Sequence, residues 1–350
     1  MLNLRPLLIL LLALAVIAGL WALARAPAPE GAALAPDREI PENSYVKVRH
    51  RIRDMQGELL YEVAAEQLDQ YPDSRVLVLD QPRLHWLDPA FKNSTASARH
   101  GEIREFQVVL NGDVRLLLDP PDYSPALMRG ESLVLDSEHE RVYSDQAVAL
   151  SQSHAVMRGI GLDYRLDGSG GRLQQDVQAR QFPSSAEKPT QALLETILEK
   201  TISTVHAEGD SKETLDLSAD RMEWDAQKEV SIYHGNVQAT QGEMVLMADR
   251  LAVHSDGDRV QALHAEGNAR WTQILNSGKP LRASAGSILY QIGQRKAILK
   301  EDVDLRVDAH QFTGKEIIYL LDEERVETPA AGKPDERIRI RLETDSRSSP

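Results

Sequence analysis

The sequence has no cysteine and few aromatic side chains among its 350 residues. Without cysteine the chain forms no disulfide, offers no thiolate to a metal and has no cysteine nucleophile. Aromatic residues make up 5% and apolar residues 42% of the composition. This balance argues against a thick globular core and favours thin β-sheets lined by Val, Leu, Ile and Ala.

Motifs that would identify an enzyme are also missing. The sequence contains no Gly-x-x-x-x-Gly-Lys-Ser/Thr loop, so we expect no ATP hydrolysis by this chain itself. The His-Glu-x-x-His, EF-hand and Gly-x-Ser-x-Gly motifs are absent, and the 10 histidines are scattered. We therefore predict no catalytic residue, no metal site and no cofactor. The net charge of −14 also disfavours nucleic acid as a partner.

What the sequence does contain is a repeated unit of two short alternating runs around a charged turn. Alternation such as Leu251/Val253 gives a strand one apolar and one polar face, and the turns return the chain as antiparallel hairpins. A single hairpin cannot bury its apolar face, so consecutive repeats are expected to stack into a long β-structure with two open ends. The clearest copies span residues 61–87, 130–152, 218–241, 248–273 and 284–308.

The N-terminal region predicts a membrane anchor. Residues 6–24 are uninterrupted by charge, and this length approaches the ~20 apolar residues needed to cross a bilayer. We interpret residues 1–26 as a single transmembrane helix with its N-terminus in the cytoplasm, followed by a Pro/Ala-rich tether over 27–44. The alternative is a cleaved signal peptide, because Ala22-Leu23-Ala24 is a small-x-small site.

The repeats fall into two groups, which predict two β-domains. Between them, Leu193, Leu194, Ile197, Leu198 and Ile202 recur at helical spacing. One continuous sheet with a helical insertion is the alternative. The predicted segments are a first β-domain at 45–182, a partly helical linker at 183–210, a second β-domain at 211–328, and a C-terminal strand and tail at 329–350.

Several motifs of the second half resemble LptA of the OstA-like lipopolysaccharide-transport family. They are LDLSADRMEW, HGNVQATQGEMVLMADRLAV, NSGKPLRASAGSILYQI and FTGKEIIYLLDEERV, in the family's order over 214–327. The first half resembles LptC, the membrane-anchored partner, through looser motifs such as LNGDVRLLL and LMRGESLVLDSEHERVYSDQAVALSQ. The chain therefore looks like a natural LptC and LptA fusion.

The resemblance implies an all-β fold of two open-ended, V-shaped antiparallel β-jellyroll domains. It also implies lipopolysaccharide transport across the periplasm, with acyl chains sheltered in a continuous hydrophobic groove. The implied partners are lipopolysaccharide, an inner-membrane ABC transporter of the LptB2FG type, and an outer-membrane LptD-like translocon or further LptA-like modules joined by edge-strand addition. The bulk of the chain is expected in the periplasm.

Family positions and strand alternation together predict the residues that line the groove. Matching family positions are Leu215, Leu217, Trp271, which follows an expected Glu-Gly-Asn turn, Tyr290 and Ile292. Spacing adds Met244 and Leu246, and alternation in the first half adds Leu133 and Leu135. The alternative is that these are ordinary core residues. Two competing functions also remain: a membrane-tethered structural scaffold, and a β-solenoid enzyme acting on polysaccharide through paired carboxylates.

Overall fold

The computed structural model divides the chain into two compact units, which are described separately. The first unit comprises Met1–Ser153, Ile160–Gly171 and Thr190–Glu199, and the second comprises His154–Gly159, Arg172–Pro189 and Lys200–Pro350. The structure describes residues 41–53, 59–71, 76–87, 93–104, 107–152, 154–183, 214–257, 259–327 and 339–342.

Every element in these described ranges is a β-strand. None of the residues covered by this description forms a helix of the length and apolarity required to span a membrane. The predicted anchor over 1–26, most of the tether over 27–44, and the helical segment of the linker lie outside the described residues.

The first unit begins with β1 (Asn43–Arg53), two residues before the predicted start of the domain. Its strands pair antiparallel, and β8 and β9 form the hairpin expected from the repeat at 130–152. The further strands are β2 (Leu59–Tyr71), β3 (Val76–Asp80), β4 (Arg83–Trp86), β5 (Thr95–Ser97), β6 (His100–Arg104), β7 (Gln107–Leu118), β8 (Ala126–Asp136) and β9 (Arg141–Gln152). Two more strands, β10 (Ala155–Arg165) and β11 (Gly170–Gln181), contribute residues to both units.

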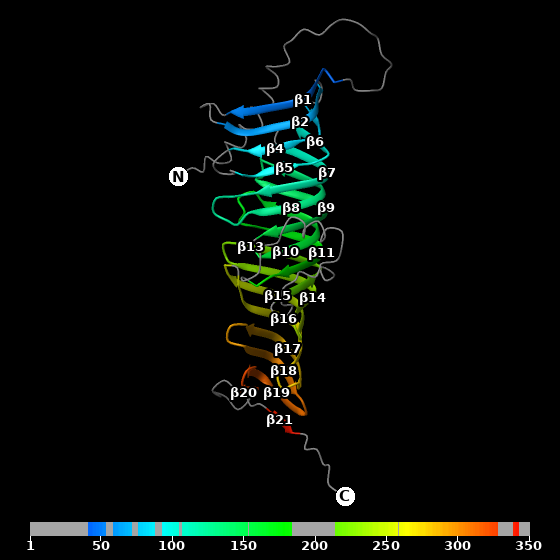
Figure 1. Cartoon of the computed structure of the whole chain (residues 1–350). Helices are drawn as coiled ribbons and strands as arrows, with labels where there is room; N and C mark the ends of the chain where they lie inside the picture. The colour runs from blue at the N-terminus through cyan, green and yellow to red at the C-terminus, as the bar shows by residue number, and fades with distance from the viewer. Residues whose placement is uncertain are drawn as a thin grey trace, which may run out of the picture. The chain divides into compact units, whose positions relative to one another are not determined.

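The second unit is an antiparallel succession in which each strand from β14 to β19 pairs with the next (Figure 1). Period-two alternation of apolar residues produces this arrangement, because it places every second side chain on the inner face. The strands are β12 (Leu215–Ala219), β13 (Arg221–Asp225), β14 (Val230–Gln241), β15 (Met244–Asp256), β16 (Arg259–Ile274), β17 (Pro280–Gln291), β18 (Lys296–Val307), β19 (His310–Leu320), β20 (Arg325–Glu327) and β21 (Arg339–Leu342).

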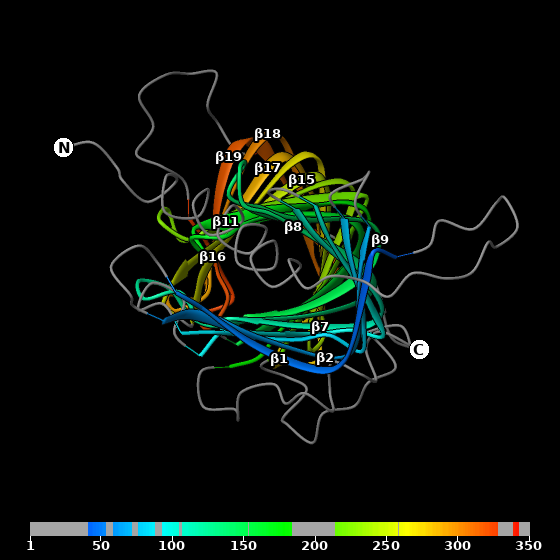
Figure 2. The ribbon, with the colours of Figure 1, turned by 90° about the horizontal axis from the view of Figure 1, so that it is seen from above.

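A β-bulge divides each long strand of this unit into two arms. In β14 the register shifts between His234 and Val237; the arm before the shift pairs with β13, and the arm after it pairs with β12. At the other end, β19 is likewise shared between β20 and β21. Because a bulge bends its strand, the strands curve rather than run flat, as Figure 2 shows for β16 and β18.

The bulge in β14 depends on a specific side-chain contact. Gly235 and Asn236 adopt positive φ angles of 75° and 46°, which glycine and asparagine tolerate best. Asn236 Nδ2 donates to both carboxylate oxygens of Asp220, at 3.1 Å and 3.0 Å. A side chain at Gly235 would collide with this carboxylate, so glycine is required there.

A glycine-asparagine bulge of the same kind occurs in β16, where the sequence predicted a turn. The Glu-Gly-Asn segment before Trp271 was expected to be a turn, but it lies inside the continuous strand Arg259–Ile274. Gly267 and Asn268 form the bulge, and Asn268 Nδ2 donates to Asp249 Oδ2 at 2.8 Å. A glycine-asparagine pair reads as a hairpin turn in sequence, whereas an aspartate on the neighbouring strand makes it a bulge here.

Candidate lipid-binding groove

The inner face of the second unit carries a row of apolar side chains that runs from strand to strand. Cross-strand register places each member directly opposite the next. The members of this first row are Ala179, Leu217, Ala239, Leu246, Trp271, Ala283, Leu305, Phe312 and Ile340. All are buried except Phe312, which is half-buried, and Ile340, which is 59% exposed.

A second row follows the other arm of the same strands, again by direct cross-strand pairing. Its members are Met222, Tyr233, Leu251, Ala265, Ile288, Leu299 and Ile317. All seven are buried. Both arms of each bulged strand therefore direct apolar side chains inward.

An aromatic contact shows that the two arms face each other. Trp271, on the arm of the first row, meets Tyr290, on the opposite arm, with ring centroids 5.8 Å apart and planes tilted by 36°. Burial raises the pKa of the Tyr290 phenol, and it raises that of Tyr319 to about 12. These shifts reflect an interior that disfavours charge.

A cavity of about 890 Å³ opens on this interior. Its apolar lining includes Phe182, Leu215, Met244, Val260, Tyr290 and Ile292, and its charged lining includes Asp216, Glu243, Arg259 and Arg295. The Arg295 guanidinium forms an ion pair with Asp322. The cavity thus combines an aliphatic and aromatic surface with charged groups.

Four of the predicted groove residues line this cavity, namely Leu215, Met244, Tyr290 and Ile292. Ile292 follows the end of β17 in a turn, where its N–H donates to Gln261 O at 3.0 Å. The sequence prediction did not include Phe182 or Val260. Phe182 directly follows β11 and is one position out of phase with Val177 and Ala179, so strand alternation gave no signal for it.

The other predicted residues are buried outside the cavity lining. Leu217, Leu246 and Trp271 stand in the first row with exposed fractions of 4%, 2% and 1%, and they are not part of the cavity lining. In the first unit, Leu133 is buried opposite Leu110. Leu135 is buried between Val108 and Val142.

One end of the cavity adjoins the pairing of β11 with β12, which we call the joint. Within the second unit, Val177–Gln181 pairs with Leu215–Ala219. Arg180 stands opposite Asp216, donating from Nε to Oδ1 at 2.6 Å and from Nη2 to Oδ2 at 3.0 Å. The Arg180 side chain is only 10% exposed and that of Asp216 is 37% exposed, so the bidentate pair is buried on its arginine side.

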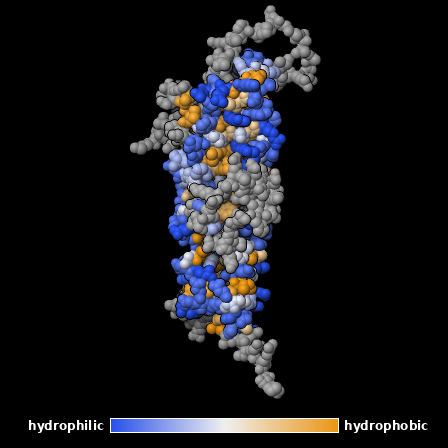
Figure 3. Space-filling view, in the orientation of Figure 1, coloured by the Kyte–Doolittle hydropathy of each residue, from blue (hydrophilic) through white to orange (hydrophobic). Residues whose placement is uncertain are grey.

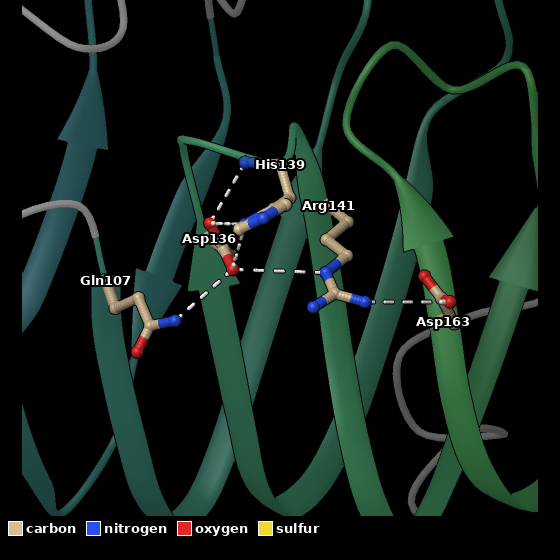
Figure 4. A network of polar contacts seen from close by, with 5 residues as sticks. All are labelled: Gln107, Asp136, His139, Arg141 and Asp163. Carbon is tan, nitrogen blue, oxygen red and sulfur yellow. Dashed lines mark hydrogen bonds and ion pairs between the residues drawn. The ribbon is translucent and has the colours of Figure 1, made fainter.

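The first unit holds a different polar arrangement at the ends of β7 to β10, shown in Figure 4. Asp136 is 1% exposed and accepts hydrogen bonds from Gln107 and from the backbone and ring of His139. Arg141 Nε lies 3.9 Å from Asp136 Oδ2, and Arg141 Nη1 lies 4.0 Å from Asp163 Oδ2. Burial alone would raise the pKa of Asp136, but the hydrogen bonds outweigh it and lower the pKa.

The face of the molecule shown in Figure 3 is mostly hydrophilic over the described residues, with smaller apolar patches. Within the residues that the structure describes, no group of three or more His, Asp or Glu side chains is arranged to hold a metal ion.

Two family models match consecutive parts of the chain. Residues 7–181, half of the chain, match the family described as "Lipopolysaccharide-assembly, LptC-related". Residues 216–325 match the family described as "LptA/(LptD N-terminal domain) LPS transport protein". The boundary between the two matches falls across the joint, after β11 and within β12.

Individual relatives are similar to the second half. The lipopolysaccharide export system protein LptA of Escherichia coli K12 is 25% identical over 138 residues, covering 39% of this chain and 75% of the relative. LptA of Haemophilus influenzae is 22% identical over 144 residues, covering 40% and 84%. The crystal structure of LptH, the LptA homologous periplasmic component from Pseudomonas aeruginosa, is 22% identical with a TM-score of 0.34, covering 37% of this chain and 95% of that one.

Proposed function

The chain belongs to the LptC-related lipopolysaccharide-assembly family, and on that premise we propose that it conveys lipopolysaccharide across the periplasm by sheltering the acyl chains inside its β-units. An LptA-like domain follows the LptC-related one, which is the arrangement of an LptC–LptA fusion. The fusion supplies two modules of one transport route in a single chain.

The cavity of the second unit is the observation that carries this proposal. Exposing hydrocarbon to water costs about 0.8 kcal/mol per methylene, so acyl chains need a continuous apolar shelter. The cavity volume of about 890 Å³ lies within the ~300–1,000 Å³ typical of small-ligand sites, and the apolar rows extend from it. We propose that Leu215, Met244, Tyr290 and Ile292 contact the acyl chains, with Leu217, Leu246 and Trp271 behind them, and that Leu133 and Leu135 serve the first unit.

The finer features of the transport route are also proposals. Each unit is taken as an open, V-shaped jellyroll whose slit leaves sugars and phosphates in water. Residues 1–26 hold the chain in the inner membrane, with the β-units in the periplasm. An inner-membrane ABC transporter supplies the energy, and an LptD-like protein or further LptA-like modules receive the lipid by edge-strand addition.

Photo-crosslinking in cells tests the proposal. A photoreactive amino acid at Met244 or Tyr290 is expected to form adducts with lipopolysaccharide. Thr272 and Ser284 are matched controls, because they are exposed residues on neighbouring strands of the same unit. Equal adduct yields at inward and outward positions, or none at either, would favour the scaffold function. Polysaccharide cleavage by the purified chain would favour the enzyme.

A further inference from the structure

Among the described residues, the last strand of the second unit is short and basic. β21 pairs with β19 through Arg339–Leu342 opposite His310–Thr313, and this pairing uses one edge of β21. Arg339 and Arg341 are exposed, and their neighbours across the pair are the uncharged Thr313 and Gln311. Among the described residues, no carboxylate forms an ion pair with either arginine. The charge at this edge is therefore available to another strand.

The joint is an antiparallel strand pair of similar length in which facing side chains carry opposite charges. There, Arg180 stands opposite Asp216, and opposite charges facing each other across antiparallel strands stabilise the pairing. By the same rule, like charges placed directly opposite destabilise it. An incoming strand at β21 thus fits best if it presents carboxylates where Arg339 and Arg341 present guanidinium groups.

A second copy of this chain does not meet that requirement. β1, for which the described residues show β2 as its pairing partner, carries exposed Lys47, Arg49 and Arg51. Glu62 on β2 pairs with both Arg49 and Arg51, so one carboxylate is shared between two cations. Docking β21 on β1, or on β21 of another copy, would place cations opposite cations. This basic character is local, because the whole chain carries a net charge of −14.

We propose that the edge of β21 that faces away from β19 docks an edge strand of a different protein that bears carboxylates, and that Arg339 and Arg341 select this strand over a second copy of the chain. The inference rests on the proposed function only in taking this end of the sheet as a site of strand addition. It adds the charge of the partner strand and a physical reason for that strand to be preferred over a second copy of the chain.

Binding of designed strand peptides tests the selection. The full chain, purified in a non-ionic detergent, is titrated with a labelled peptide of alternating Val and Glu, and with its Gln and Lys counterparts. At low salt the Glu peptide is expected to bind at least tenfold more tightly than the Lys peptide, and the difference should shrink as salt rises. In the Arg339→Glu/Arg341→Glu variant the preference should invert. Equal affinity of the three peptides for the wild-type chain would overturn the proposal.

Self-association gives a second, independent readout. In sedimentation velocity, Arg339→Glu/Arg341→Glu is expected to form end-to-end chains, because its new carboxylates match the cations of β1. Arg270→Glu/Arg282→Glu is the matched control, since it makes the same charge change at exposed positions on β16 and β17. The neutral variant Arg339→Gln/Arg341→Gln should lose peptide selectivity even if the reversed variant frays. End-to-end association of the wild type equal to that of the reversed variant would contradict the proposal. Neither readout involves lipid, so a failure of lipopolysaccharide crosslinking would leave both unchanged.

Discussion

Two short strand pairs of the second unit, the joint and the β19–β21 pair, share the same antiparallel backbone pattern but differ in their side chains. The joint contains an ion pair whose arginine is buried, and its apolar residue Leu217 is 4% exposed. In the β19–β21 pair, Arg341 lies opposite the uncharged Gln311, and the apolar residue Ile340 is 59% exposed. Leu217 and Ile340 belong to the same row, so the backbone pairing pattern alone does not explain why one strand pair is buried and the other is exposed. The two pairs differ in the burial of their apolar residues and in the charges that face each other.

Charge reversal at the joint is expected to have the largest effect on this comparison. Arg180→Asp would place two carboxylates opposite each other with one of them largely buried, which should cost about 3–5 kcal/mol of unfolding free energy. Urea denaturation and amide hydrogen exchange of β12 measure the loss. The double variant Arg180→Asp/Asp216→Arg should recover at least half of it. A double variant no more stable than Arg180→Asp would show that the ion pair does not hold the joint.

Shortening the buried row at the joint should have the next largest effect. Leu217→Ala removes buried methyl groups and leaves a cavity, at an expected cost of roughly 3 kcal/mol in unfolding free energy. Leu217→Met is the control, because it nearly conserves volume and should cost less than about 1.5 kcal/mol. Equal stability of the alanine variant and the wild type in denaturant titrations would mean that this part of the row is not packed.

The buried carboxylate of Asp136 in the first unit tests whether a buried charge also contributes to the unfolding free energy away from the joint. Asp136→Asn should lower the unfolding free energy at pH 7 by about 1–3 kcal/mol, because it weakens hydrogen bonds to a buried charge. The pKa of Asp136 is lowered from 3.8 in the folded state, so its stabilisation is present above that pH and is lost as pH falls through the folded pKa.

The gap in stability between wild type and Asp136→Asn is therefore expected to narrow as the pH falls below about 4. Denaturation series from pH 7 to pH 3 measure it. Asp122→Asn, at an exposed turn, is the control and should leave stability within about 0.5 kcal/mol. A gap that widens with acidification would contradict the assignment of Asp136 as the stabilising anion.

The smallest effect is expected at the outer pair. Ile340→Ala removes an exposed side chain from the same row as Leu217, so unfolding free energy should change by less than about 0.5 kcal/mol. A loss as large as that of Leu217→Ala would show that Ile340 is covered in solution and would remove the contrast between the two pairs.

Sequence patterns predicted much of the second unit but not its bends. Alternation at Leu251/Val253 identified strands and their inner faces, since side-chain direction in a strand follows from position. The glycine-asparagine pair before Trp271 was misread, because the contact that makes it a bulge comes from Asp249, eighteen residues earlier than Gly267. Local sequence does not contain that contact.

The candidate groove shows the same division. Family positions and spacing named Leu215, Leu217, Met244, Leu246, Trp271, Tyr290 and Ile292. All seven lie in the first row or along the cavity, and all are buried except Ile292, which is half-buried. Which of them reach the cavity depends on how far the two arms of each strand close on each other. Tyr290 lines the cavity, whereas Trp271, which contacts it, does not. Strand alternation in the sequence does not predict this difference.

By itself, the sequence determined that this chain is a repeating antiparallel β-protein with an apolar inner face, because period-two alternation and regular turns are local properties. Tertiary structure alone decided that Arg180 meets Asp216, that the two rows face each other, and that β19 is the strand that pairs with β21 among the described residues. These features depend on register between strands that are distant in the chain, and register is set by the packing of whole faces rather than by neighbouring residues.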